Sequence, residues 1–316
     1  SERNLLTNAW LIKCVGAPVF CAPNIGSGGY LGSSYAPVFI GSADNHPAMP
    51  KFKLPEIYDL GDKDRLQERR KLLAALESDR LAEEPAGKDW SELRELAYDS
   101  MTRPEGRAAF NLNEEPLAVR ERYGMHPLGQ NLLLARRMVE AGVRFVTVNG
   151  WVGSAPGETG GGPPSSSWDM HGGNMGMGNA FSTGSYGMGH CLPRLDEALS
   201  ALLTDLKDRG MLNDTLVVAM GEFGRTPVIL TQGPPGRQHW PQCFSAIIAG
   251  CGIRGGAVYG ESDKTASAPK SNPVTPQDLH ATVLHALGVP LNDLGKNTGI
   301  IRPPFSSGKP VTALFG

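Results

Sequence analysis

Apolar residues in the second half of the chain alternate between the spacing of helices and that of buried strands. The sequence NLLLARRMVEAG follows Gln130 with apolar residues three and four positions apart, and the apolar run VRFVTVNGWV comes next. LPRLDEALSALLTDLKDRG then places its leucines on one helical face and leads into TLVVAMG. Two helix-then-strand units in series are typical of an α/β fold with a mostly parallel sheet between helices.

Two further elements extend this pattern. CFSAIIAG predicts a third strand, and VTPQDLHATVLHALG predicts a helix in which Thr275 and Asp278 have the spacing of a capping box. Gly142 and Gly210 directly follow the first two helices, where glycine commonly ends a helix. We therefore expect an α/β core over residues 123–316, with an irregular tail after its last helix.

The first 122 residues have a different pattern. Residues 1–59 are rich in Gly, Ser, Pro and Asn, which predicts an irregular, loop-rich segment. Residues 60–122 carry more charge, and KDRLQERRKLLAALESDRLA and DWSELRELAYDSM have the spacing of amphipathic helices. We interpret this second segment as helical, with its charges on solvated helix faces.

Composition narrows the class of protein. The chain has 316 residues, 40% of them hydrophobic, and a net charge of −2, which excludes a disordered polyelectrolyte and argues against nucleic-acid binding. Its five cysteines are widely spread and have no paired zinc or redox spacing. No stretch approaches the ~20 apolar residues of a membrane span, and we find no signal peptide in this chain. The oligomeric state does not follow from these features.

Candidate chemistry lies in the loops after the predicted strands, where doubly wound sheets bind their ligands. These loops contain the sequences WDMH, GEFGRT and GRQHW. Asp169 and His171 are two residues apart and, with His239 as a third group, can offer a divalent metal ion oxygen and nitrogen ligands. Arg225 and Arg237 carry guanidinium groups that suit a tetrahedral anion.

Each of these residues also has a purely structural interpretation. An Asp-x-His sequence in a glycine-rich loop often forms a turn with a surface imidazole, and His239 can pack against the neighbouring Trp240. Glu222, directly after a strand, can serve as a metal ligand or acid-base group, or can simply pair with Arg225 or Arg237. The residues alone leave these alternatives open.

A family resemblance rests on an ordered set of motifs: LLLARRMVEAGVRFVTVN, WDMH, LPRLDEALSALLTDLKDRGMLNDTLVVAMGEFGRTP, GRQHWP, IIAGCGIRGGAVYG and TPQDLHATVLHALG. From the loop GGYLGSSYAPVF to Leu287, the chain resembles the bacterial domain-of-unknown-function family 1501. That family looks like a branch of the alkaline phosphatase and sulfatase superfamily. The resemblance implies an alkaline-phosphatase-like layered fold and export to the periplasm or the exterior. It also implies a metal-dependent hydrolase of phosphate or sulfate esters, acting on a small-molecule or glycan ester.

The resemblance also implies roles for single residues. Asp169, His171 and His239 are similar to the ligands of one divalent metal ion, which can be Zn, Ca, Mg or Mn. Glu222 stands in the place of a carboxylate ligand and is either ligand or base. The guanidinium groups of Arg225 and Arg237 would orient the anion and stabilise its developing charge.

The chain departs from the superfamily pattern at three places. Phe223 occupies the position of an imidazole ligand, which argues against a second metal site, and Gln238 replaces an Asp that family members usually carry beside His239. No strand followed by a nucleophile is visible before Tyr30, so we expect the N-terminal strand and nucleophile segment to be lacking. Phe223 and the missing nucleophile segment favour an alternative, a catalytically silent binding or scaffold protein of the same fold that recognises sulfated or phosphorylated glycans.

Overall fold

The computed structural model divides the chain into two compact units. Unit 1 comprises Ser1–Asp169 and Phe181–Leu202, and unit 2 comprises Met170–Ala180 and Leu203–Gly316. Each unit is described by itself. The structure describes residues 8–12, 26–28, 35–54, 63–76, 108–158, 167–172, 188–233, 235–291 and 306–316.

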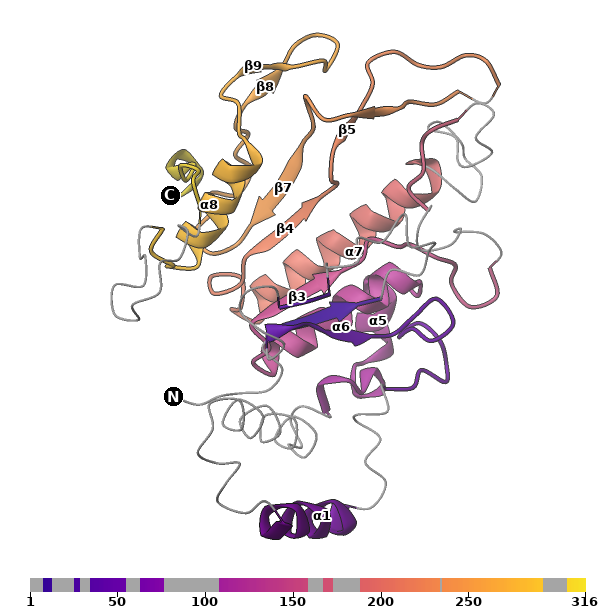
Figure 1. Ribbon diagram of the computed structural model, residues 1–316. Coiled ribbons are helices and arrows are strands. Elements are labelled where there is room, and N and C mark those ends of the chain that lie inside the picture. The colour runs from indigo at the N-terminus through magenta and orange to yellow at the C-terminus, as the bar shows by residue number, and fades with distance from the viewer. Residues whose placement is uncertain are drawn as a thin grey trace. The chain divides into compact units, whose positions relative to one another are not determined.

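Unit 1 contains a parallel sheet of three strands in the order β2-β1-β3 (Figure 1). The central strand is β1 (Asn8–Leu11), which pairs on one side with β2 (Val38–Ile40) and on the other with β3 (Phe145–Val148). Two alternate residues of the central strand, Ala9 and Leu11, are fully buried. Parallel sheets need long connections between neighbouring strands, and the connection from β2 to β3 contains helices of the unit.

This sheet corrects the expectation for the N-terminal segment. Residues 1–59 were expected to be irregular and loop-rich, without the N-terminal strand and nucleophile segment of the superfamily, yet β1 forms the centre of the sheet. The strand is four residues long and its partners begin at positions 38 and 145, so pairing with distant segments determines it. Local turn composition, from which the loop was predicted, carries no information on such pairing.

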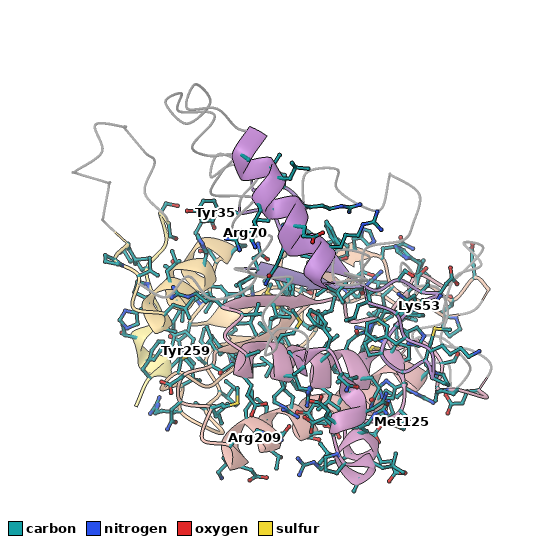
Figure 2. All side chains as sticks on the ribbon, turned by 90° about the horizontal axis from the view of Figure 1, so that it is seen from below. Tyr35, Lys53, Arg70, Met125, Arg209 and Tyr259 are labelled. Atoms are coloured by element: carbon teal, nitrogen blue, oxygen red, sulfur yellow. The ribbon has the colours of Figure 1, made fainter. Side chains whose placement is uncertain are left out.

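Helices α1, η4, α5 and α6 lie between β2 and β3 along the chain. α6 (Pro127–Glu140) packs against β3, and η4 (Leu112–Glu114) and α5 (Leu117–Arg122) precede it. α1 (Lys63–Leu76) is a separate helix whose described side chains are mostly exposed, as expected for a charged segment (Figure 2). The helix predicted for DWSELRELAYDSM lies outside the described residues.

A long helix, α7 (Met188–Asp208), crosses the boundary between the units. Its unit 1 part contributes to a buried apolar cluster of that unit. The fully or nearly buried members are Leu128, Val152, Cys191 and Ala198, and the partly buried ones are Leu132, Val148, Trp168 and Leu195. The leucine face predicted for this helix therefore packs as expected at Leu195, whereas Leu192 remains exposed.

The described part of unit 2 contains antiparallel strand pairs, the end of α7, and the helices that follow the strands. β4 (Val217–Met220) pairs with β7 (Ala246–Ala249), and the shorter pairs are β5 (Gly224–Arg225) with β6 (His239–Trp240), and β8 (Glu261–Ser262) with β9 (Pro269–Ser271). α8 (Pro276–Ala286) and η6 (Thr312–Leu314) follow. The molecule is thus α/β, but the mostly parallel sheet is only partly realised, because the described strands outside unit 1 pair antiparallel.

The helix ends follow the sequence closely. At the end of α6, Gly142 has φ +99° and its amide donates to the carbonyl of Val139. The amide of Val143 donates to the carbonyl of Met138, and these two hydrogen bonds together form a Schellman motif. At the start of α8, Thr275 and Asp278 form the predicted capping box with both reciprocal hydrogen bonds. Among the described helices, none combines the length and apolar character needed to cross a bilayer.

Candidate functional site

A strand hairpin in unit 2 brings predicted site residues together. In the pairing of β5 with β6, Arg225 lies opposite His239. The amide of Thr226 extends this pairing by donating to the carbonyl of Gln238 at 2.9 Å. Arg237 lies two residues before His239 in the chain, so the hairpin carries two guanidinium groups and one imidazole.

The segment that contains His171 is held against this hairpin. The amide of Arg237 donates to the carbonyl of Met170 at 2.7 Å. Gly236 approaches the His171 backbone so closely that a Cβ at position 236 would lie 2.1 Å from the His171 carbonyl oxygen. Only glycine fits there without moving His171, so the glycine of the GRQHW motif has a positioning role.

The two histidines meet as a result. The ring centroids of His171 and His239 are 4.7 Å apart, with an angle of 54° between the ring planes. Imidazole nitrogens bind zinc at about 2.0–2.1 Å, so rings at this separation are close enough for both to reach one ion after small rotations. The structure therefore places two of the three expected metal ligands side by side in one unit.

An aromatic side chain covers part of this imidazole pair. The ring of Phe223 lies 4.1 Å from that of His239, measured between centroids, and is tilted by 35°. The guanidinium carbon of Arg225 lies 5.7 Å from the centre of the Phe223 ring, within the range of a cation-π contact. Arg225 also donates from Nη1 to the carbonyl oxygen of Arg237 at 3.3 Å. Phe223, in the place of an expected imidazole, thus packs against His239 and orients Arg225.

The two carboxylates are placed differently. Asp169 is 8% exposed and is the last residue of the first stretch of unit 1, whereas Glu222 is exposed in the loop between β4 and β5. Among the described residues, no three His, Cys, Asp or Glu side chains are grouped closely enough to hold a metal ion. Since catalytic zinc sites use three protein ligands, the described side chains meet this requirement only in part, with two imidazoles.

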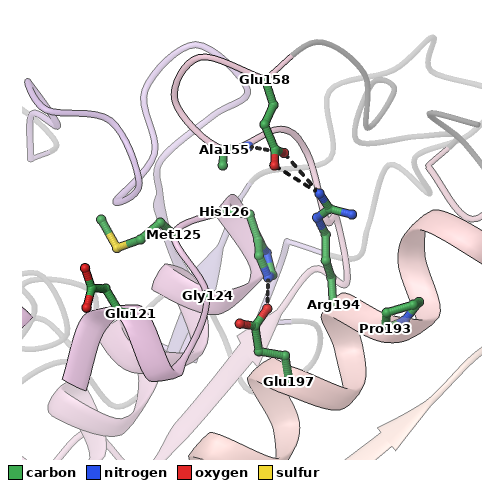
Figure 3. Close-up of a pocket in the computed structure, with 9 residues that line it drawn as sticks. All are labelled: Glu121, Gly124, Met125, His126, Ala155, Glu158, Pro193, Arg194 and Glu197. Atoms are coloured by element: carbon green, nitrogen blue, oxygen red, sulfur yellow. Dashed lines mark hydrogen bonds and ion pairs between the residues drawn. The ribbon is translucent and has the colours of Figure 1, made fainter. Parts of the chain in front are cut away.

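A second candidate site is a cavity in unit 1, of about 610 Å³. The sequence did not indicate it, because its residues come from a helix start, a loop and a helix face that share no motif. The residues that line it are Glu121, Gly124, Met125, His126, Ala155, Glu158, Pro193, Arg194 and Glu197 (Figure 3).

His126 is the most buried polar group of this cavity, with 3% of its surface exposed. As the N-cap of α6, it accepts a hydrogen bond at Nδ1 from the amide of Gly129 at 3.2 Å, so the neutral ring carries its proton on Nε2. Burial lowers the pKa of His126 to about 4, and the positive charge of Arg194 contributes to the decrease. The imidazole is therefore neutral near pH 7.

One close approach and one ion pair shape the walls of the cavity (Figure 3). Nε2 of His126 lies 3.5 Å from Oε2 of Glu197, which comes from α7. Nη2 of Arg194 is 3.1 Å from Oε2 of Glu158, and the same carboxylate accepts from the amide of Ala155 at 3.1 Å. These hydrogen bonds and the charge of Arg194 lower the pKa of Glu158, with the backbone contact as the largest cause.

Comparison with known proteins identifies a family for this chain. No curated protein matches the chain, and no solved structure does. Residues 16–314 match the model of a family described as "Protein of unknown function (DUF1501)", so the chain belongs to that family.

Proposed function

We propose that unit 2 carries the site of a metal-dependent hydrolase that acts on phosphate or sulfate esters. The observation that supports this proposal is the contact of His171 with His239, at 4.7 Å between ring centroids, on a hairpin that also carries Arg225 and Arg237. Imidazoles and guanidinium groups together suit a cation and the tetrahedral anion that it binds. The substrate class is a small-molecule or glycan ester.

Each residue has a distinct task in this proposal. A divalent cation bound to the imidazoles of His171 and His239 would polarise the ester oxygen. Arg225, oriented by Phe223, and Arg237 would hold the anionic group by charge-assisted hydrogen bonds. Asp169 and Glu222 are the candidates for the further ligand or base, the part of the site that the described side chains do not assemble.

Metal analysis together with two chromogenic assays tests the proposal. The purified chain is analysed for bound metal and incubated with p-nitrophenyl phosphate and p-nitrophenyl sulfate. His171→Ala and His239→Ala should each lose metal and activity, whereas His280→Ala, at an exposed position of α8 in the same unit, should keep both. Absence of both metal and turnover in the unaltered chain would overturn the proposal.

One observation favours a second candidate, a binding protein that recognises phosphorylated or sulfated glycans without turnover. Phe223 packs on His239 at a place where a further ligand was expected, and a phenyl ring cannot coordinate a metal. Stoichiometric metal or tight sulfate binding without hydrolysis of either ester would support this candidate. Loss of anion binding in Arg225→Ala would then locate the binding site on the hairpin.

A further inference from the structure

The cavity of unit 1 contains more negative charge than its residues neutralise. Three carboxylates and one guanidinium group line it, and the imidazole of His126 is neutral near pH 7. Arg194 is already engaged by Glu158 and by the carbonyl of His190, so it is not available to an anion. The lining therefore has a formal charge of −2, located at Glu121 and Glu197.

A buried donor adds a second, independent observation. Nε2 of His126 is inaccessible to solvent and has no hydrogen-bond partner among the described residues. It faces Oε2 of Glu197, but at 3.5 Å the separation is too long for a normal hydrogen bond (Figure 3). A buried donor without a partner costs about 1–3 kcal/mol. The side chain of Glu197 is 48% exposed, and when it turns aside it admits the acceptor oxygen of a ligand to Nε2.

The missing acceptor must also suit the carboxylate beside it. A hydroxyl group meets both demands, because its oxygen can accept from Nε2 of His126 while its proton is donated to Glu197. An ammonium group on the same molecule would neutralise the remaining carboxylate charge, at Glu121 or Glu197.

The shape of the cavity selects an organic molecule over a metal ion. Its volume of about 610 Å³ exceeds that of an ion with its first ligands, and the described residues include no metal-binding group of three. In addition, the Nε2 proton of neutral His126 blocks the lone pair that a metal would need. Met125, Pro193 and Ala155 add apolar surface for a carbon skeleton.

We propose that this cavity binds a small organic cation that carries a hydroxyl group next to its ammonium group, as an amino sugar does. Gly124 supports the same geometry. It has φ +85°, and a Cβ there would lie 2.5 Å from Nε2 of His126 and 2.8 Å from Oε2 of Glu197. A side chain at position 124 would collide with both groups, so glycine is needed for the imidazole and the carboxylate to lie this close together.

Calorimetric titration of the full chain with glucosamine at pH 7 tests the proposal. Glucosamine should bind, glucose should not because it lacks the charge, and cyclohexylamine should bind more weakly because it lacks the hydroxyl groups. Glu197→Gln should weaken glucosamine binding by about tenfold or more, as expected for a lost charge-assisted contact. Asp196→Asn, which removes the same charge from an exposed neighbour outside the lining, should bind as the unaltered chain does.

Several results would overturn the proposal: no glucosamine binding, equal binding of glucose or of cyclohexylamine, or equal weakening by Asp196→Asn. If Glu197→Gln does not fold, as judged by circular dichroism, Glu121→Gln provides the second test and should also weaken binding. None of these measurements involves His171 or His239. The outcome is therefore independent of the hydrolase proposed for unit 2.

Discussion

Replacement of Glu115 by Gln is expected to destabilise unit 1 strongly. Glu115 is 8% exposed and forms ion pairs with two arginines of α6. Its Oε1 is 2.8 Å from Nη2 of Arg136 and 2.5 Å from Nη1 of Arg137. The side chain of Arg136 is completely buried, so its charge depends on protein carboxylates for neutralisation. Glutamine keeps the size of the side chain and one acceptor but removes that charge.

The expected loss follows from what remains after the substitution. Breaking a buried ion pair from one side costs about 3–5 kcal/mol, because the other charge stays buried. Arg136 keeps Glu140 at 2.6 Å, and Arg137 keeps Glu114 at 2.8 Å and the carbonyl of Ala109 at 2.9 Å. We therefore expect the lower end of the range, a loss of about 3 kcal/mol in the free energy of unfolding.

Urea unfolding and amide hydrogen exchange of residues 127–140 measure this loss. Glu114→Gln is the matched control, because Glu114 pairs with the same arginine but its side chain is 50% exposed, and it should cost at most about 1 kcal/mol. Burial alone would raise the pKa of Glu115, but Arg137 and Arg136 hold that pKa below its ordinary value of 4.5. The difference in the free energy of unfolding between the unaltered chain and Glu115→Gln should therefore persist from pH 7 to 5. It should shrink as the pH falls further below 4.5. Equal costs for the two variants would refute the reasoning.

Two further outcomes are expected. The pKa of His126 is lowered from 6.5 to about 4, so between these pH values the imidazole is protonated in the unfolded chain and neutral in the folded chain. Stability should therefore fall as the pH drops from about 6.5 to about 4, by at most about 3 kcal/mol from this residue. His126→Gln should flatten that dependence in urea titrations, and an unchanged dependence would contradict the expectation. Thr275→Ala should cost about 1 kcal/mol, since it removes the capping box with Asp278, and hydrogen exchange of α8 should accelerate; unchanged exchange would contradict this expectation.

Helix ends were predictable because their causes are local. Thr275 and Asp278 cap α8 through hydrogen bonds between residues three positions apart, and Gly142 ends α6 by its own backbone conformation. The start of α6 was predicted three residues late, at Gln130 instead of Pro127. Its cap is His126, whose imidazole accepts the hydrogen bond that Ser, Thr, Asp or Asn usually accepts, so the common cap pattern does not reveal it.

Strand pairing was less predictable than strand position. The apolar runs that contain β3, β4 and β7 were found correctly, but β4 and β7 pair antiparallel, and β1 was missed. An apolar run indicates burial and gives no information on the direction of the neighbouring strand. Direction depends on the path of the connection, which for β4 and β7 passes through the β5–β6 hairpin.

The contacts within the candidate sites were also predictable only in part. Loops that follow strands were expected to converge, and His171 and His239 do lie together, yet the expectation had no means of placing the Phe223 ring against His239. The cavity in unit 1 had no sequence signal at all. Glu197 reads as a charged residue on a solvated helix face, and only the fold brings it to 3.5 Å from the buried His126.

Helix α6 connects the two main features of unit 1, and this connection is testable. His126 caps its first turn at the cavity, and Arg136 lies ten residues later, about 15 Å along the axis, in the ion pair with Glu115. Because the first turn is also held by Gln130, which donates to the carbonyls of Arg120 and Gly124 at 2.9 Å, loosening the far end need not release the imidazole. Glu115→Gln should therefore lower stability while glucosamine affinity stays within about twofold under conditions where the variant is folded. A parallel loss of both would mean that the cavity exists only when the whole helix is intact, and that the ion pair positions His126.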